Sequence, residues 1–154
     1  MAPLDDWQRA AQRLDVLPEA ARRDPVGIYA RAVAAARRGQ RERALELLNG
    51  LAERLPALSQ EIAALEAECQ IEIGPFGTAA EYYASQPSCR AWLQAARAWL
   101  RAGNPSRALG EIERVLESPK SSRGLVVQAR ALRAEIAERA GLLTLARRDY
   151  RWLD

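Results

Sequence analysis

Four glycines recur along this chain, and each is flanked by alanines at constant distances. One alanine stands seven residues before each glycine and another stands five residues after it. The glycines are 35, 29 and 38 residues apart, close to the period of about 34 residues typical of helix-turn-helix repeats. Because small side chains let two helices pack closely, this spacing predicts a row of stacked helical hairpins. The four sets are Ala32-Gly39-Ala44, Ala67-Gly74-Ala79, Ala96-Gly103-Ala108 and Ala134-Gly141-Ala146.

Residues that begin and end helices occur at similar intervals along the chain. Asp24-Pro25 and Asn104-Pro105 each combine an N-cap side chain with a proline in the first turn. The segment Thr78–Glu81 has the form of a capping box, and Ser59 and Ser88 are further N-cap candidates. No segment alternates with the period of a strand, so the sequence predicts an all-α fold. The expected helices span about 25–38, 42–54, 59–73, 78–86, 88–102, 104–117, 122–140 and 143–154.

We expect residues 25–154 to form a solenoid, preceded by a capping helix and linker over residues 1–24. The apolar residues between Leu4 and Leu17, Trp7 among them, lie at helical spacing. A dimerisation or partner helix is the alternative to a cap. The expected repeats are 25–58, 59–88, 89–121 and 122–154. The predicted core consists of Ala32, Leu48, Ala67, Trp92, Ala96, Trp99, Ala108, Ile112, Ala134 and Ala146.

The two ends of the sequence carry further expectations. Tyr150, Trp152 and Leu153 leave an apolar C-terminal end that either a longer chain or another subunit would cover. Self-association through this end or through the N-terminal helix is therefore one option. Asp5 and Asp6 interrupt the N-terminus where a signal peptide would be apolar, and no stretch is long and apolar enough for a transmembrane helix. We therefore expect a cytoplasmic protein without membrane contact.

The composition excludes several kinds of chemistry. The 154 residues include no histidine and two cysteines, which removes Ser-His-Asp and Cys-His nucleophiles and almost every catalytic zinc site. The turn at Gly74–Thr78 lacks the lysine of a phosphate-binding loop. We therefore expect no catalytic residue, no cofactor and no metal site, and we interpret Cys69 and Cys89 as structural thiols. A net charge of +3 is small for a nucleic-acid-binding surface.

The residue pattern resembles that of the tetratricopeptide repeat (TPR) family. The third unit matches best, through Trp92, Ala95, Ala96, Trp99, Ala108, Ile112 and Pro119. The first and fourth units carry parts of the pattern, and the second is the weakest because Pro87 shortens its second helix. The resemblance covers residues 25–154. It implies a right-handed α-solenoid whose first helices line a concave groove.

Charges segregate along this expected groove. Residues 55–89 contain five glutamates and no basic residue, whereas residues 90–154 contain 13 basic and 7 acidic side chains. Matched repeat positions carry Glu61, Glu68 and Glu72 in the second unit and Arg90, Arg97 and Arg101 in the third. The resemblance implies that these positions face the groove. They would form either ion pairs between repeats, each worth about 0–1 kcal/mol when exposed, or a polarised surface that recognises a charged peptide or helix.

The resemblance also implies a function. It points to a non-enzymatic protein–protein interaction module, a scaffold or adaptor, that binds a peptide or helix of a partner in the groove. The expected groove residues are Tyr29, Val33, Arg37, Glu61, Glu68, Glu72, Arg90, Gln94, Arg97 and Arg101. The first three stand where the family's carboxylate clamp carries Lys and Asn, so we do not expect recognition of a C-terminal carboxylate. The alternatives are a chaperone of a bacterial type III secretion system, the TPR part of a larger bacterial multi-domain protein, and a nucleic-acid-binding helical repeat protein.

Overall fold

The computed structural model describes Arg9, residues 12–13 and residues 18–154. The chain divides into two compact units, residues 1–74 and residues 75–154. The described residues form helices and turns and contain no strand, which confirms the predicted all-α fold. Most of the predicted capping helix, Trp7 included, lies outside the described residues. Within the described part of the chain, no helix is both long and apolar enough to cross a membrane.

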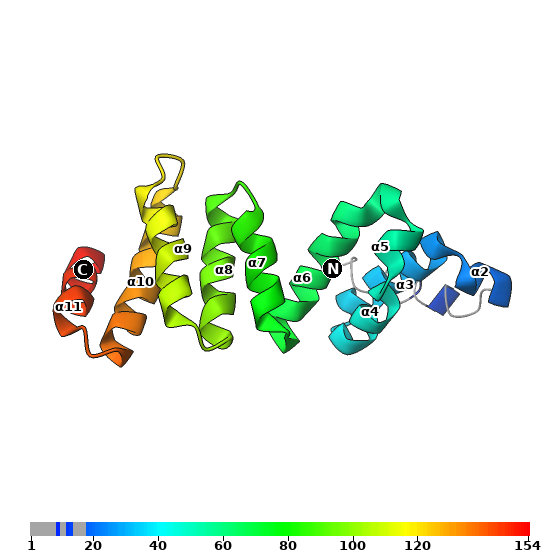
Figure 1. Cartoon of the computed structure of the whole chain (residues 1–154), viewed down its shortest axis with the longest axis horizontal. Helices are drawn as coiled ribbons and strands as arrows, with labels where there is room; N and C mark the ends of the chain where they lie inside the picture. The colour runs from blue at the N-terminus through cyan, green and yellow to red at the C-terminus, as the bar shows by residue number, and fades with distance from the viewer. Residues whose placement is uncertain (1–8, 10–11, 14–17) are drawn as a thin grey trace. The chain divides into compact units, whose positions relative to one another are not determined.

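The boundary between the units falls between the two helices of the predicted repeat 59–88 (Figure 1). In the first unit the helices are α2 (Glu19–Arg23), α3 (Pro25–Arg37), α4 (Arg41–Leu48), α5 (Leu51–Arg54), the 3₁₀ helix η1 (Pro56–Leu58) and α6 (Ser59–Ile73). In the second unit they are α7 (Phe76–Ser85), α8 (Cys89–Arg101), α9 (Pro105–Glu117), α10 (Arg123–Arg139) and α11 (Leu143–Leu153).

Three helices begin with side-chain caps, and the sequence predicts two of them, Asp24 and Asn104. The side chains of Asp24, Asn104 and Ser122 each accept a hydrogen bond from the backbone N–H three residues later, at 3.2, 3.2 and 3.3 Å. These bonds satisfy N–H groups that the first turn of a helix leaves without partners. Two other predicted caps are wrong. Ser59 is already the first residue of α6, and Thr78 lies inside the first turn of α7, which begins at Phe76 after Pro75.

Three of the four periodic glycines end helices in the same way. The backbone N–H of Gly39, Gly103 and Gly141 donates to the carbonyl three residues earlier at 3.0 Å, and the next N–H donates to the carbonyl five residues earlier. This pair of bonds is the Schellman motif, which requires the left-handed backbone that glycine adopts without strain. Gly74 differs because Pro75 follows it and has no N–H for the second bond. The regular pattern is therefore interrupted where the two units meet in sequence.

The first unit is built around α3, α4 and α6. One of its buried clusters consists of Ala32, Leu48, Leu51 and Ile62. The single helix expected over 42–54 is wrong, because Gly50 takes a left-handed conformation with φ 67° and separates α4 from α5. Asn49 and Gly50 together thus form a turn that redirects the chain before Leu51 enters the core.

The second unit stacks α7, α8, α9, α10 and α11, each against the next in sequence, and α8 also contacts α10. The contacts between these helices are lined by alanines, and Ala79, Ala96, Ala108 and Ala134 are completely buried. Nine of the ten predicted core residues are buried in the two units. The exception is Trp92, which is half-buried and has the Arg114 guanidinium over its ring.

Candidate protein-interaction surfaces

Helix α8 carries two kinds of residue on opposite faces. Arg90, Gln94, Arg97 and Arg101 follow one another at intervals of four, three and four residues, which places them on one face of the helix. Trp92 and Trp99 are seven residues apart and lie about half a turn away from that set. The polar face is turned toward α10, and the indoles are covered by arginines of α9.

Arg97 joins the polar face of α8 to α10. Its Nη2 donates to the Gln128 Oε1 at 3.1 Å, and its Nη1 donates to the Gln94 Oε1 at 3.5 Å. Both acceptors are neutral amides, and in the described part of the chain Arg97 makes no ion pair. The guanidinium is therefore held in a defined position while its charge stays uncompensated by a carboxylate. We call Arg90, Gln94, Arg97 and Gln128 the α8/α10 surface.

The other predicted residues of the third repeat lie beside this surface. Arg90 and Arg101 are exposed, and Gln94 is half-buried. The guanidinium carbon of Arg101 lies 5.8 Å from the centre of the Phe76 ring, so this arginine also packs against α7. The structure thus brings the four predicted residues of α8 together on one helix face.

The six predicted groove residues of the first unit fall on two helices. Tyr29, Val33 and Arg37 are on α3, where Tyr29 packs against the buried cluster and Arg37 is exposed. Glu61, Glu68 and Glu72 are on α6, and all three are exposed. The glutamates and the arginines of the expected ladder belong to different units, and their pairing stays a prediction.

On the other side of α8, two arginines of α9 lie over the two tryptophans. The Arg107 guanidinium is 4.5 Å from the centre of the Trp99 ring, and that of Arg114 is 4.3 Å from the Trp92 ring. At these distances a cation is attracted to the electron-rich face of an indole. The Trp92 Nε1 donates to the Gln86 carbonyl at 2.8 Å, so both this hydrogen bond and the Arg114 guanidinium hold the Trp92 ring.

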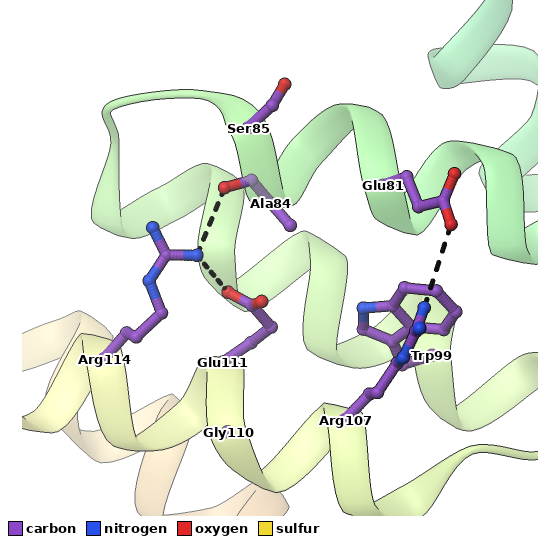
Figure 2. A pocket seen from close by; sticks show the side chains of 8 residues that line it. All are labelled: Glu81, Ala84, Ser85, Trp99, Arg107, Gly110, Glu111 and Arg114. Atoms are coloured by element: carbon purple, nitrogen blue, oxygen red, sulfur yellow. Dashed lines mark hydrogen bonds and ion pairs between the residues drawn. The ribbon is translucent and has the colours of Figure 1, made fainter.

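A cavity of about 590 Å³ lies between α7 and α9 beside these stacked pairs. Figure 2 shows Arg107 and Glu81 at one end and Arg114, Glu111 and Ala84 at the other. Its remaining lining residues are Ser85, Trp99 and Gly110. Arg114 donates to the Glu111 Oε2 at 2.7 Å and to the Ala84 carbonyl at 3.1 Å, whereas Arg107 approaches Glu81 only to 3.7 Å.

Sequence reasoning treated Trp92 and Trp99 as core and missed the arginines above them. A signal was present, because Arg107 and Arg114 repeat the interval of seven residues that separates the two tryptophans. When two residues are seven apart on one helix and two others are seven apart on a neighbouring helix, the two pairs can make two parallel contacts. Matched intervals of this kind in consecutive helices could have identified the stacked pairs.

Asp149 forms a buried ion cluster that attaches α11 to α10. Its carboxylate is inaccessible to solvent and accepts hydrogen bonds from Arg133 at 2.7 Å (twice) and from Arg130 at 3.0 Å. Burial acts to raise the pKa of Asp149, but the hydrogen bonds and charge of Arg133, together with those of Arg130, outweigh it and lower the pKa below its ordinary value. The carboxylate is therefore ionised at neutral pH and holds the last helix in place.

The C-terminal helix also exposes apolar side chains. Leu142, Leu143, Tyr150 and Trp152 are all at least two-fifths exposed. The Trp152 ring lies 4.4 Å from the Arg130 guanidinium, and the Tyr150 hydroxyl donates to Glu138 at 3.0 Å. The apolar end expected from the sequence is thus present, with its two aromatic rings fixed by polar contacts.

Both cysteines are free and buried. Burial is what we expect of structural thiols. The Cys89 Sγ donates to the Ser118 Oγ at 3.3 Å. Hydrogen bonding with the side chains of Ser118 and Ser121 lowers the pKa of the Cys89 thiol, whereas burial raises the pKa of Cys69. Among the residues that the structure describes, no three acidic or cysteine side chains come together as metal ligands would.

Comparison of the chain with models of known protein families, with curated proteins and with solved structures gives no match.

Proposed function

We propose that this chain is a non-enzymatic protein–protein interaction module built of TPR-like helical hairpins, and that its α8/α10 surface binds an acidic peptide or helix of a partner protein. The observation that carries the proposal is the position of Arg97. Two glutamine side chains orient its guanidinium, and among the described residues it has no acidic partner. A positioned cation of this kind has lost much of its side-chain entropy before a partner binds.

The charge of the second unit supports an acidic partner. Residues 75–154 contain 13 basic and 8 acidic side chains, a net charge of +5, whereas residues 1–74 contain 10 basic and 12 acidic side chains. Opposite charge on a partner would speed its encounter with this unit and exclude basic competitors. Arg90 extends the α8/α10 surface by two turns, and Val127 beside Gln128 adds an exposed apolar contact.

The test uses the purified full chain to capture partners from a lysate, followed by affinity measurement with the partner identified. The variant is the double reversal R90E/R97E, which leaves Arg101 and its contact with Phe76 intact. The matched control is R147E/R148E, which reverses two exposed arginines of α11. We expect the first variant to weaken binding at least about tenfold and to flatten its salt dependence, because exposed charges are screened at high ionic strength. The control should change affinity by less than about threefold.

Equal binding by R90E/R97E and wild type would reject the α8/α10 surface and leave the apolar surface of α11 as the better candidate. A second arm offers duplex DNA and single-stranded RNA in place of protein. The chain could bind nucleic acid with a steep salt dependence, and R90E/R97E could abolish that binding. This pair of results would replace the proposal by the nucleic-acid-binding alternative.

A further inference from the structure

The cavity between α7 and α9 has the form of a short trough. Glu81, Ala84 and Ser85 recur at intervals that place them on one face of α7. On α9, Arg107, Gly110, Glu111 and Arg114 do the same over seven residues, a rise of about 10 Å. That length corresponds to about three residues of extended peptide. The trough therefore matches a peptide segment in length.

Gly110 lies in the middle of the trough, and the packing of the helices does not require a glycine at this position. It does not have a positive φ, and a Cβ added to it would meet no heavy atom within 4 Å. A glycine inside a helix costs stability relative to alanine. Neither backbone geometry nor a close neighbour accounts for this cost, and its visible effect is to keep the space between Arg107 and Arg114 open (Figure 2).

Arg107 offers hydrogen-bond donors into this space. Its side chain is 58% exposed, and its guanidinium carbon lies 4.5 Å from the centre of the Trp99 ring. No hydrogen bond from this guanidinium to another described residue is present, and the nearest Glu81 oxygen is 3.7 Å away. Arg114, in contrast, already donates to a carbonyl and to a carboxylate.

The charges of the lining select the kind of anion. A carboxylate can accept two parallel hydrogen bonds from one guanidinium, and such bonds are among the strongest in proteins. Glu81 and Glu111 lie in the same trough. Their negative charge would repel a doubly charged phosphate more strongly than a singly charged carboxylate. The trough therefore favours the side chain of aspartate or glutamate.

We propose that the trough between α7 and α9 binds an acidic peptide segment, with Arg107 as the ligand of one peptide carboxylate and Gly110 as the space for the peptide chain. The site is separate from the α8/α10 surface, because it lies on the indole side of α8. It would give this unit a second contact with an acidic partner.

The experiment measures binding of a fluorescein-labelled peptide of alternating alanine and glutamate to the full chain by fluorescence anisotropy, at about 0.15 M salt, where exposed charges more than about 8 Å apart are largely screened. R107Q removes the proposed ligand, and we expect it to weaken binding at least about tenfold. G110L fills the trough and should weaken binding to a similar degree. E81Q removes the competing carboxylate and should strengthen binding several-fold.

Three controls separate this site from general attraction. R123Q removes one exposed arginine of α10 and should leave the affinity within about twofold of wild type. A peptide of alternating alanine and glutamine should not bind. Circular dichroism and melting temperature establish that R107Q and G110L are folded, and the indole N–H resonance of Trp99 should shift on titration with the acidic peptide in wild type.

The inference is overturned when folded R107Q and G110L both bind the acidic peptide as tightly as wild type does. It is also overturned when free glutarate at the same carboxylate concentration displaces the peptide completely, since the site would then take small dicarboxylates. Loss of binding in R90Q/R97Q with full retention in R107Q would place the peptide on the α8/α10 surface instead. That result would reject the trough and support the proposed function.

Discussion

At the scale of single residues, Asp149 has the largest expected effect on stability. It is a fully buried carboxylate with two arginine partners, and Arg133 is itself only 11% exposed. Asp149→Asn would leave both guanidinium groups without their counter-ion. We expect it to lower the free energy of unfolding by about 3 kcal/mol, the lower end for a broken buried pair, because Arg130 still reaches solvent. Urea unfolding measures the change, and Asp154→Asn, an exposed acid at the chain end, should change it by less than about 0.5 kcal/mol.

The same carboxylate makes stability depend on pH in a defined direction. Its pKa is about 3.8 in an unfolded chain and lower in the folded one, so the unfolded state binds a proton more readily. The stabilisation is therefore complete above the unfolded pKa and is lost as the pH falls through the folded pKa. The difference in unfolding free energy between wild type and Asp149→Asn should be constant from about pH 5 to 7 and should shrink below about pH 4. A difference that grows on acidification would contradict this account.

At the scale of helices, the close packing of α9 depends on alanine at one position and tolerates substitution two residues further on. Ala108 is fully buried, so Ala108→Leu should overpack the interface and lower the free energy of unfolding by about 1–3 kcal/mol. Gly110→Ala on the same helix meets open space and should raise it by up to about 1 kcal/mol. Thermal unfolding of the two variants gives the comparison. A neutral Ala108→Leu would mean that α9 can move away from α8.

Helix ends show how far local sequence determines an element. Asn104 caps α9 and Gly103 closes α8 as predicted, because both effects use hydrogen bonds within a few residues. The capping box at Thr78 fails for a local reason as well, since Pro75 provides an earlier start for α7. The break at Gly50 was missed although the dipeptide Asn49-Gly50 favours a turn over a helix interior. In the structure Gly50 is left-handed and Leu51 is buried directly after the turn.

At the scale of the whole molecule, the boundary at Gly74 and Pro75 divides the chain into two units, each with its own buried residues. We expect residues 75–154 expressed alone to be helical and to unfold cooperatively, because α7 to α11 pack on one another in sequence order. Circular dichroism and thermal melting of this fragment test the expectation. A fragment without a melting transition would mean that the second unit depends on the first for stability.

The sequence by itself determined the helical class, most helix bounds, and the face of α8 on which Arg90, Gln94, Arg97 and Arg101 lie. These properties follow from period, caps and glycines, which act within a few residues of one another. Only the tertiary structure decided that Arg97 bonds to Gln128, that Arg107 and Arg114 cover the tryptophans, and that Asp149 is buried between two arginines. Each of those contacts joins different helices, and the side-chain pairs that meet depend on how the helices are rotated and spaced when their alanines pack.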